Sequence, residues 1–217
     1  EGIDLPGFSY YDTQNGFHIY KNDYALPMGF TFDTYVSRSQ WETYSESDRC
    51  NLLLRALVLE DDAVETYQND MQKLPDAVHQ MSDEDLLTKC TERAKTACDS
   101  FTYNSKGFHA TISTDHANLV FFSVPWEEGW SAEVNGEPVS IEKADVGFMA
   151  VPVAAGDSEI TFTYHTPGLK AGALLSLGGL VLFAGYLTVA GIYNKRHPNP
   201  KTESICCVDY STEETAN

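Results

Sequence analysis

The chain has 217 residues, of which 32 are acidic and 14 basic, so its formal net charge is −18 at pH 7. All of the excess lies before Lys170: 28 acidic and 10 basic residues precede it, against four of each from Lys170 onward. Such an acidic surface repels nucleic acid and anionic lipid headgroups, and we expect no nucleic-acid partner.

The five cysteines do not form a clear disulfide framework or metal motif. Two of them, Cys90 and Cys98, fall on a predicted helix about 12 Å apart by helical rise, too far to bridge each other. Either could pair with Cys50, so the redox state of the three stays open. Because no Cys or His spacing is typical of a metal site, we predict neither a metal nor a cofactor.

The first part of the chain, residues 8–35, reads as short extended pieces. Aromatic residues alternate there with Gly and Asn, which favours strands and turns over helix. Asn15-Gly16 is a hairpin-type turn signal between the first two pieces.

Residues 47–101 are predicted to be mainly helical. An apolar side in residues 47–60 indicates one helix, and residues 82–98 another, with Ser82 and Asp85 as a capping box. The expected buried stripe of the second helix is Leu86, Leu87, Cys90, Ala94, Ala97 and Phe101. An acidic run at 60–65 and the Asp83-x-Asp85 pattern admit a metal hypothesis. A solvated charge run and a capped helix start explain them better.

From residue 107 to 166 the pattern changes to period two. Six short segments read as strands, and Asn135-Gly136 and Gly156 mark turns between them. Strands this short, joined by turns, predict an antiparallel β-sandwich, so the fold class is α+β with a helical insert.

The stretch from Trp126 to Trp130, WEEGW, carries the most suggestive side chains. Trp126 and Trp130 could stack on a sugar while Glu127 and Glu128 accept its hydroxyl groups. The alternatives are a turn with core tryptophans, which we favour, and a hydrolytic pair of carboxylates. We identify no catalytic residue here.

Residues 171–193 lack a charged side chain and are long enough to cross a bilayer, so 169–193 is predicted to be a transmembrane helix. Lys170 precedes the span, and Lys195 and Arg196 follow it. The positive-inside rule then places the tail, 194–217, in the cytoplasm and residues 1–168 outside the cell membrane. The tail is polar and is predicted to be disordered. A buried core helix is the alternative for the span.

Small residues recur through the span. They fit packing against other transmembrane helices or ordinary membrane-helix composition equally well. The chain begins at Glu1 without an initiator Met or signal peptide, so we expect the C-terminal part of a longer protein, or else a mature product.

Three segments carry a resemblance to a known family. They are IYKNDYALPMGF at 19–30, FFSVPWEEGWSAEVNGEPV at 121–139, and GFMAVPVAAGDSEITFTYHTPGLKAGALL at 147–175. In order and spacing the chain resembles the C-terminal end of the bacterial YfhO-like membrane proteins over about residues 8–190. The match is loose at 60–100 and does not include the tail.

The resemblance implies a multi-pass protein with upstream transmembrane helices, related to glycosyltransferases that use lipid-linked sugars and act on cell-envelope polymers such as lipoteichoic acid. The catalytic carboxylate of that class lies on an early outer loop, so no residue here inherits its role. The expected partners are the bilayer, the upstream helices, and a cell-envelope glycan or lipid-linked sugar. The alternative is a non-enzymatic, single-pass surface module that binds carbohydrate or protein.

Overall fold

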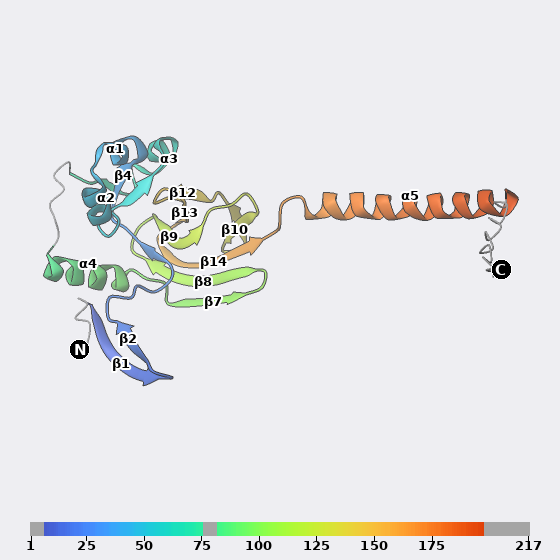
Figure 1. Ribbon diagram of the computed structural model, residues 1–217. Helices are drawn as coiled ribbons and strands as arrows, with labels where there is room; N and C mark the ends of the chain where they lie inside the picture. Colours follow the sequence, from blue (N-terminus) through green and yellow to red (C-terminus); the bar gives the residue numbers. More distant parts are fainter. Residues whose placement is uncertain (1–6, 76–81, 198–217) are drawn as a thin grey trace, which may run out of the picture. The chain divides into compact units, whose positions relative to one another are not determined.

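A computed structural model describes residues 7–75 and 82–197 (Figure 1). The chain divides into two compact units, residues 1–166 and 167–217. The first unit contains fourteen strands and four helices within its described residues, and the second contains one long helix. The fold is therefore α+β followed by a C-terminal apolar helix, as the sequence predicts.

A separate hairpin opens the first unit. Its strands are β1 (Phe8–Gln14) and β2 (Phe17–Asn22), paired antiparallel. The predicted turn is confirmed, because Asn15 and Gly16 have φ values of 52° and 81°, both left-handed. This backbone favours Asn-Gly, since glycine adopts positive φ without strain and Asn tolerates it.

Five strands form an entirely antiparallel sheet. In spatial order they are β11 (Glu137–Val139), β10 (Trp130–Val134), β14 (Gly156–Tyr164), β8 (Gly107–Thr114) and β7 (Ser100–Asn104). The period-two pattern is visible in β8, where Phe108, Ala110 and Ile112 are buried and their neighbours are less so. One face of this sheet therefore forms a core.

A second sheet has seven strands. In spatial order they are β3 (Phe30–Thr31), β9 (Asn118–Pro125), β13 (Phe148–Val153), β12 (Glu142–Ala144), β5 (Leu57–Leu59), β4 (Thr34–Ser37) and β6 (Gln72–Lys73). All pairings among the strands of residues 107–166 are antiparallel, as the predicted sandwich requires, whereas β4, which precedes them in the chain, runs parallel to both β5 and β6.

The two sheets share one core. Phe108 and Phe162 of the five-stranded sheet stack with ring centroids 4.4 Å apart, and Phe162 meets Phe122 of β9 at 5.3 Å. The alternate residue of β9, Phe121, joins a different cluster with Ala63 and Tyr67 of α3 (Asp61–Tyr67). Strand β9 is thus buried on both faces, which explains its continuous apolar run.

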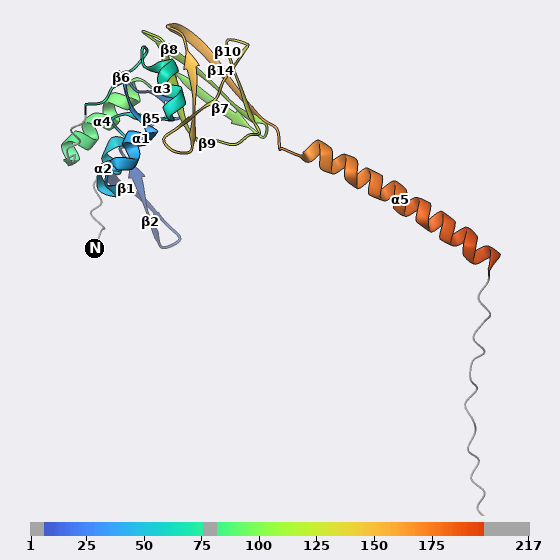
Figure 2. The same ribbon diagram turned by 90° about the horizontal axis from the view of Figure 1, so that it is seen from above.

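Short helices lie beside β4, β5 and β6 (Figures 1 and 2). They are α1 (Arg38–Thr43), α2 (Glu46–Leu52) and α3. The prediction of helix through residues 47–60 is wrong beyond Leu52, because Leu57–Leu59 form the fully buried strand β5. Apolar runs this short do not distinguish helix from buried strand.

The predicted helix at 82–98 is confirmed as α4 (Asp83–Lys95), with Ser82 and Asp85 in a complete capping box. Its buried side differs from the prediction. Leu87 is 46% exposed, whereas Arg93 is buried, donates to the backbone oxygen of Thr31 and lies over the ring of Phe32. Its Nη2 also lies 3.7 Å from Oδ2 of Asp33, whereas its buried Nε has no hydrogen-bond partner among the described residues.

A turn between β12 and β13 holds a buried carboxyl group. Asp145 donates its backbone N–H to the oxygen of Val58, and its side-chain Oδ1 accepts the Val58 N–H, both at 2.9 Å. These bonds extend the pairing of β12 with β5 by one residue. Burial raises the pKa of Asp145 from 3.8 to about 7.

The second unit consists of α5 (Leu169–Arg196) within its described residues. At 28 residues it is about 42 Å long, and it is the one helix of the described residues long and apolar enough to cross a membrane. Lys170 falls in its first turn, and Lys195 and Arg196 in its last. The helix continues through 194–196, which were predicted as tail, and the rest of the tail lies outside the described residues.

Candidate functional site

A pocket of about 710 Å³ opens at one end of the two-sheet core. The register brings together the start of β8, the end of β14 and the start of β10, since Gly107 pairs with Thr163 and Trp130 with Tyr164. The lining residues are Met28, Phe101, Tyr103, Asn104, Ser105, Lys106, Gly107, Phe108, Val124, Pro125, Glu127, Trp130 and Tyr164. This volume is within the usual range of about 300–1,000 Å³ for small-ligand sites.

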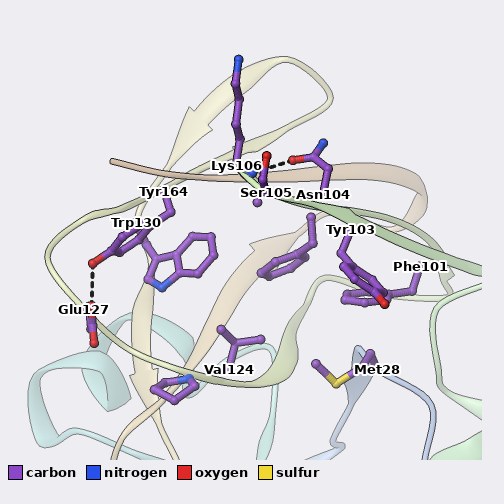
Figure 3. A pocket seen from close by; sticks show the side chains of 13 residues that line it. Met28, Phe101, Tyr103, Asn104, Ser105, Lys106, Val124, Glu127, Trp130 and Tyr164 are labelled. Carbon is purple, nitrogen blue, oxygen red and sulfur yellow. Dashed lines mark hydrogen bonds between the residues drawn. The ribbon is translucent and has the colours of Figure 1, made fainter. Parts of the chain in front are cut away.

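Five of the thirteen residues that line the pocket are aromatic (Figure 3). Trp130 lies between Phe108 and Tyr164, with centroid distances of 5.6 and 5.0 Å. On the other side Phe101 contacts Tyr103 at 6.5 Å, and Tyr103 is 82% exposed. The wall thus combines rings held by the core with one ring free to meet a ligand.

Polar groups lie at the edge of the pocket. The Tyr164 hydroxyl donates to Oε2 of Glu127 at 2.7 Å, and this bond raises the pKa of Tyr164 above its ordinary value. Asn104 and Lys106 come from the β7–β8 turn, where Oδ1 of Asn104 accepts the Lys106 N–H at 2.7 Å. The Tyr164 N–H in turn donates to the backbone oxygen of Lys106 at 2.7 Å. These bonds fix the turn against the end of β14.

Two of the four predicted contact residues line the pocket and two do not. Glu127 and Trp130 line it, whereas Glu128 and Trp126 are absent from the lining. The ring of Trp126 is half-buried against the core and lies 4.1 Å from the Lys143 ammonium, in a cation–π contact. The two carboxylates therefore do not share this pocket, and sequence reasoning missed the side that β7 contributes.

The described residues also locate the other groups considered as sites. Within residues 7–75 and 82–197, no three His, Cys, Asp or Glu side chains are grouped so that they could hold a metal ion. In the acidic run, Asp61 accepts from Ser39 and Asp62 accepts the N–H of Ala63 at the start of α3. The three cysteines Cys50, Cys90 and Cys98 are free thiols.

The described residues combine an α+β unit that contains the pocket with one apolar helix long enough to cross a membrane. Residues 77–176 match the family described as "Bacterial membrane protein YfhO", so the chain carries a YfhO-like family region and the resemblance is confirmed. A Bacillus subtilis (strain 168) protein described as "Uncharacterized protein YfhO" is 30% identical over 121 residues. That alignment covers 56% of this chain and 13% of the relative. No solved structure matches the chain.

Proposed function

We propose that the first unit is the extracytoplasmic accessory domain of a membrane glycosyltransferase that uses a lipid-linked sugar, and that its pocket positions the glycan of a cell-envelope polymer such as lipoteichoic acid. The YfhO-like region supports the membrane-protein part of this proposal. In the proposed protein, further transmembrane helices of the same polypeptide carry the catalytic groups, and no residue described here is catalytic.

The aromatic pocket is the observation that carries the proposal. Aromatic rings present flat, amphipathic faces that suit the C–H faces of sugars, and carboxylates accept hydroxyl hydrogen bonds. The pocket offers both, through Trp130, Tyr103 and Glu127. Only residues 165–168 separate Tyr164 from α5.

The orientation of the chain is part of the proposal. Lys195 and Arg196 occupy the last turn of α5, and Lys201 follows in the sequence. The positive-inside rule assigns this end to the cytoplasm, and the first unit then lies outside.

A second candidate function is a carbohydrate-binding surface module without catalysis. It is favoured by one observation: every residue that lines the pocket lies between Met28 and Tyr164, so the site is formed within the first unit. The module would bind the same glycans but would not depend on other membrane helices.

Deleting residues 8–168 from the complete membrane protein separates the two candidates. We expect glycosyl transfer to its acceptor to fall by at least about tenfold, because positioning a reactant supplies a large part of catalysis. Deleting residues 198–217 serves as the matched control and should leave transfer unchanged. Transfer that persists at the normal rate, with the shortened protein present at equal level in the membrane, would contradict the accessory role.

A further inference from the structure

We propose that the pocket recognises uncharged sugar units and excludes the phosphate chain of an anionic acceptor polymer. This inference rests on the proposed function, because it names the ligand class of the same pocket. It predicts that the domain contacts a sugar, and not the polyanionic backbone to which the sugar is attached.

The charges on the pocket lining nearly cancel. Among its thirteen lining residues, Lys106 is the one cation and Glu127 the one carboxylate. Proteins that bind phosphate use several Lys or Arg side chains, a bidentate Arg, or the N-terminus of a helix. No Arg lines this pocket, and its walls come from strands and the turns between them. One exposed ammonium, in a lining that also carries one carboxylate, is a weak anion site.

Five of the nine other cations in the first unit contact internal partners. Arg38 pairs with Glu42, Lys89 with Glu92, and Arg93 with Asp33 and the Thr31 carbonyl. Arg49 donates to two backbone carbonyls, and Lys143 lies over Trp126. These five side chains are thus engaged within the domain and are less free to bind a polyphosphate.

The net negative charge of the first unit also disfavours binding of a polyanion, but it acts over a longer distance. Residues before Lys170 carry an excess of 18 negative charges. At physiological ionic strength, charges more than about 8 Å apart are largely screened, so the lining decides selectivity more than the total charge does. At low ionic strength the total charge should add to the exclusion of a polyanion.

The groups that remain suit a neutral sugar. Tyr103 and Trp130 offer ring faces, and the side chains of Asn104 and Ser105 offer hydroxyl and amide donors and acceptors (Figure 3). The carboxylate of Glu127 has lone pairs beyond the one that Tyr164 uses. None of these contacts requires a charge on the ligand.

Binding to the full 217-residue chain, held in lipid nanodiscs of uncharged phosphatidylcholine, tests the inference by calorimetry. The probes are chitotriose, cellotriose and a poly(glycerol phosphate) of similar length. We expect at least one trisaccharide to bind, and the polyanion to bind at least about tenfold more weakly at roughly 0.15 M salt. Trisaccharide affinity should change less than about twofold when the salt is varied, since no counterions are released.

Three variants identify the site. Tyr103→Ala should weaken trisaccharide binding by about two- to tenfold, which is the size of an aromatic contact. Tyr11→Ala is the matched control, because Tyr11 is also an exposed strand tyrosine, at 70%, but lies on β1 outside the pocket. Lys106→Glu should weaken polyanion binding more than trisaccharide binding, since a neutral ligand gains little from one exposed charge.

The possible outcomes separate this inference from the proposed function. Polyanion binding as tight as that of the trisaccharides, with loss on Lys106→Glu, would overturn the selectivity but leave a glycan-polymer site. Binding of no probe would remove the pocket from the proposed function and the inference with it. Trisaccharide binding that Tyr103→Ala does not weaken would also overturn the inference, because the contact would lie elsewhere.

Discussion

Replacing Asp145 by Asn should stabilise the first unit at pH 8 and have little effect at pH 4. Burial raises the pKa of Asp145 to about 7 from 3.8, so the folded state favours the neutral carboxyl group. A shift of about three units corresponds to at most about 4 kcal/mol between the two protonation states. The stabilising contribution is fully present below pH 3.8 and is lost as the pH rises through about 7.

Asparagine suits this position because it is neutral and keeps the geometry. Its side-chain oxygen can accept the Val58 N–H as Oδ1 of Asp145 does, and it tolerates the φ of 45° found there. Asp145→Ala is the contrasting variant. It leaves the Val58 N–H without its acceptor and should destabilise the unit by about 1–3 kcal/mol at pH 4, where the wild-type carboxyl group is neutral in the folded state.

Urea unfolding followed by tryptophan fluorescence measures these effects, because Trp41, Trp126 and Trp130 all lie in the first unit. Acidification also protonates exposed carboxylates such as Asp12 and Asp85, whose pKa values hydrogen bonds hold below the ordinary value, and this opposes the trend. The difference between wild type and Asp145→Asn cancels their contribution. A difference that does not change between pH 4 and pH 8 would show that Asp145 does not titrate as described.

The second large effect is expected from Gly107→Ala. A Cβ atom at Gly107 would lie 1.9 Å from the backbone oxygen of Phe162 on the neighbouring strand β14. Moving either strand would cost much free energy, because β8 and β14 pair along eight residues and their inner faces are packed. We expect a loss of about 3 kcal/mol or more, which lowers the melting temperature by on the order of 10 °C.

Gly147→Ala is the matched control for this steric argument. A Cβ atom at Gly147 meets no atom within 4 Å, and its backbone is not left-handed. Its melting temperature, followed by the same tryptophan fluorescence, should stay within about 2 °C of wild type. Equal melting temperatures for the two alanine variants would mean that β8 and β14 do not approach as closely as described.

Short-range sequence patterns predicted correctly those features that interactions between nearby residues determine. The turns at Asn15-Gly16 and Asn135-Gly136 have positive φ at both residues, as such pairs favour. The capping box at Ser82 starts α4 where expected, and the uncharged run of residues 171–193 is helical throughout. Each of these features depends on residues within one or two turns of chain.

Sequence reasoning failed where contacts with residues far away in the sequence determine the structure. Leu57–Leu59 is a strand because β4 and β12 flank it, although its composition also suits a helix. Arg93 is buried because it reaches the carbonyl of Thr31, 62 residues away. Eleven of the thirteen lining residues were missed, Tyr103 among them, because the pocket joins Met28 and the β7–β8 turn to segments much later in the chain. The sequence signal for Tyr103 was an aromatic residue directly before the polar turn residues 104–106.

The most direct measurement of the central claim is glycosyl transfer by the complete membrane protein carrying Tyr103→Ala or Tyr11→Ala. Both tyrosines are exposed, at 82% and 70%, so neither substitution should unfold the domain. The account predicts that Tyr103→Ala lowers transfer at limiting acceptor by about two- to tenfold, while Tyr11→Ala leaves it unchanged. Equal transfer by both variants and by wild type, at equal levels in the membrane, would contradict the claim that this pocket positions a glycan.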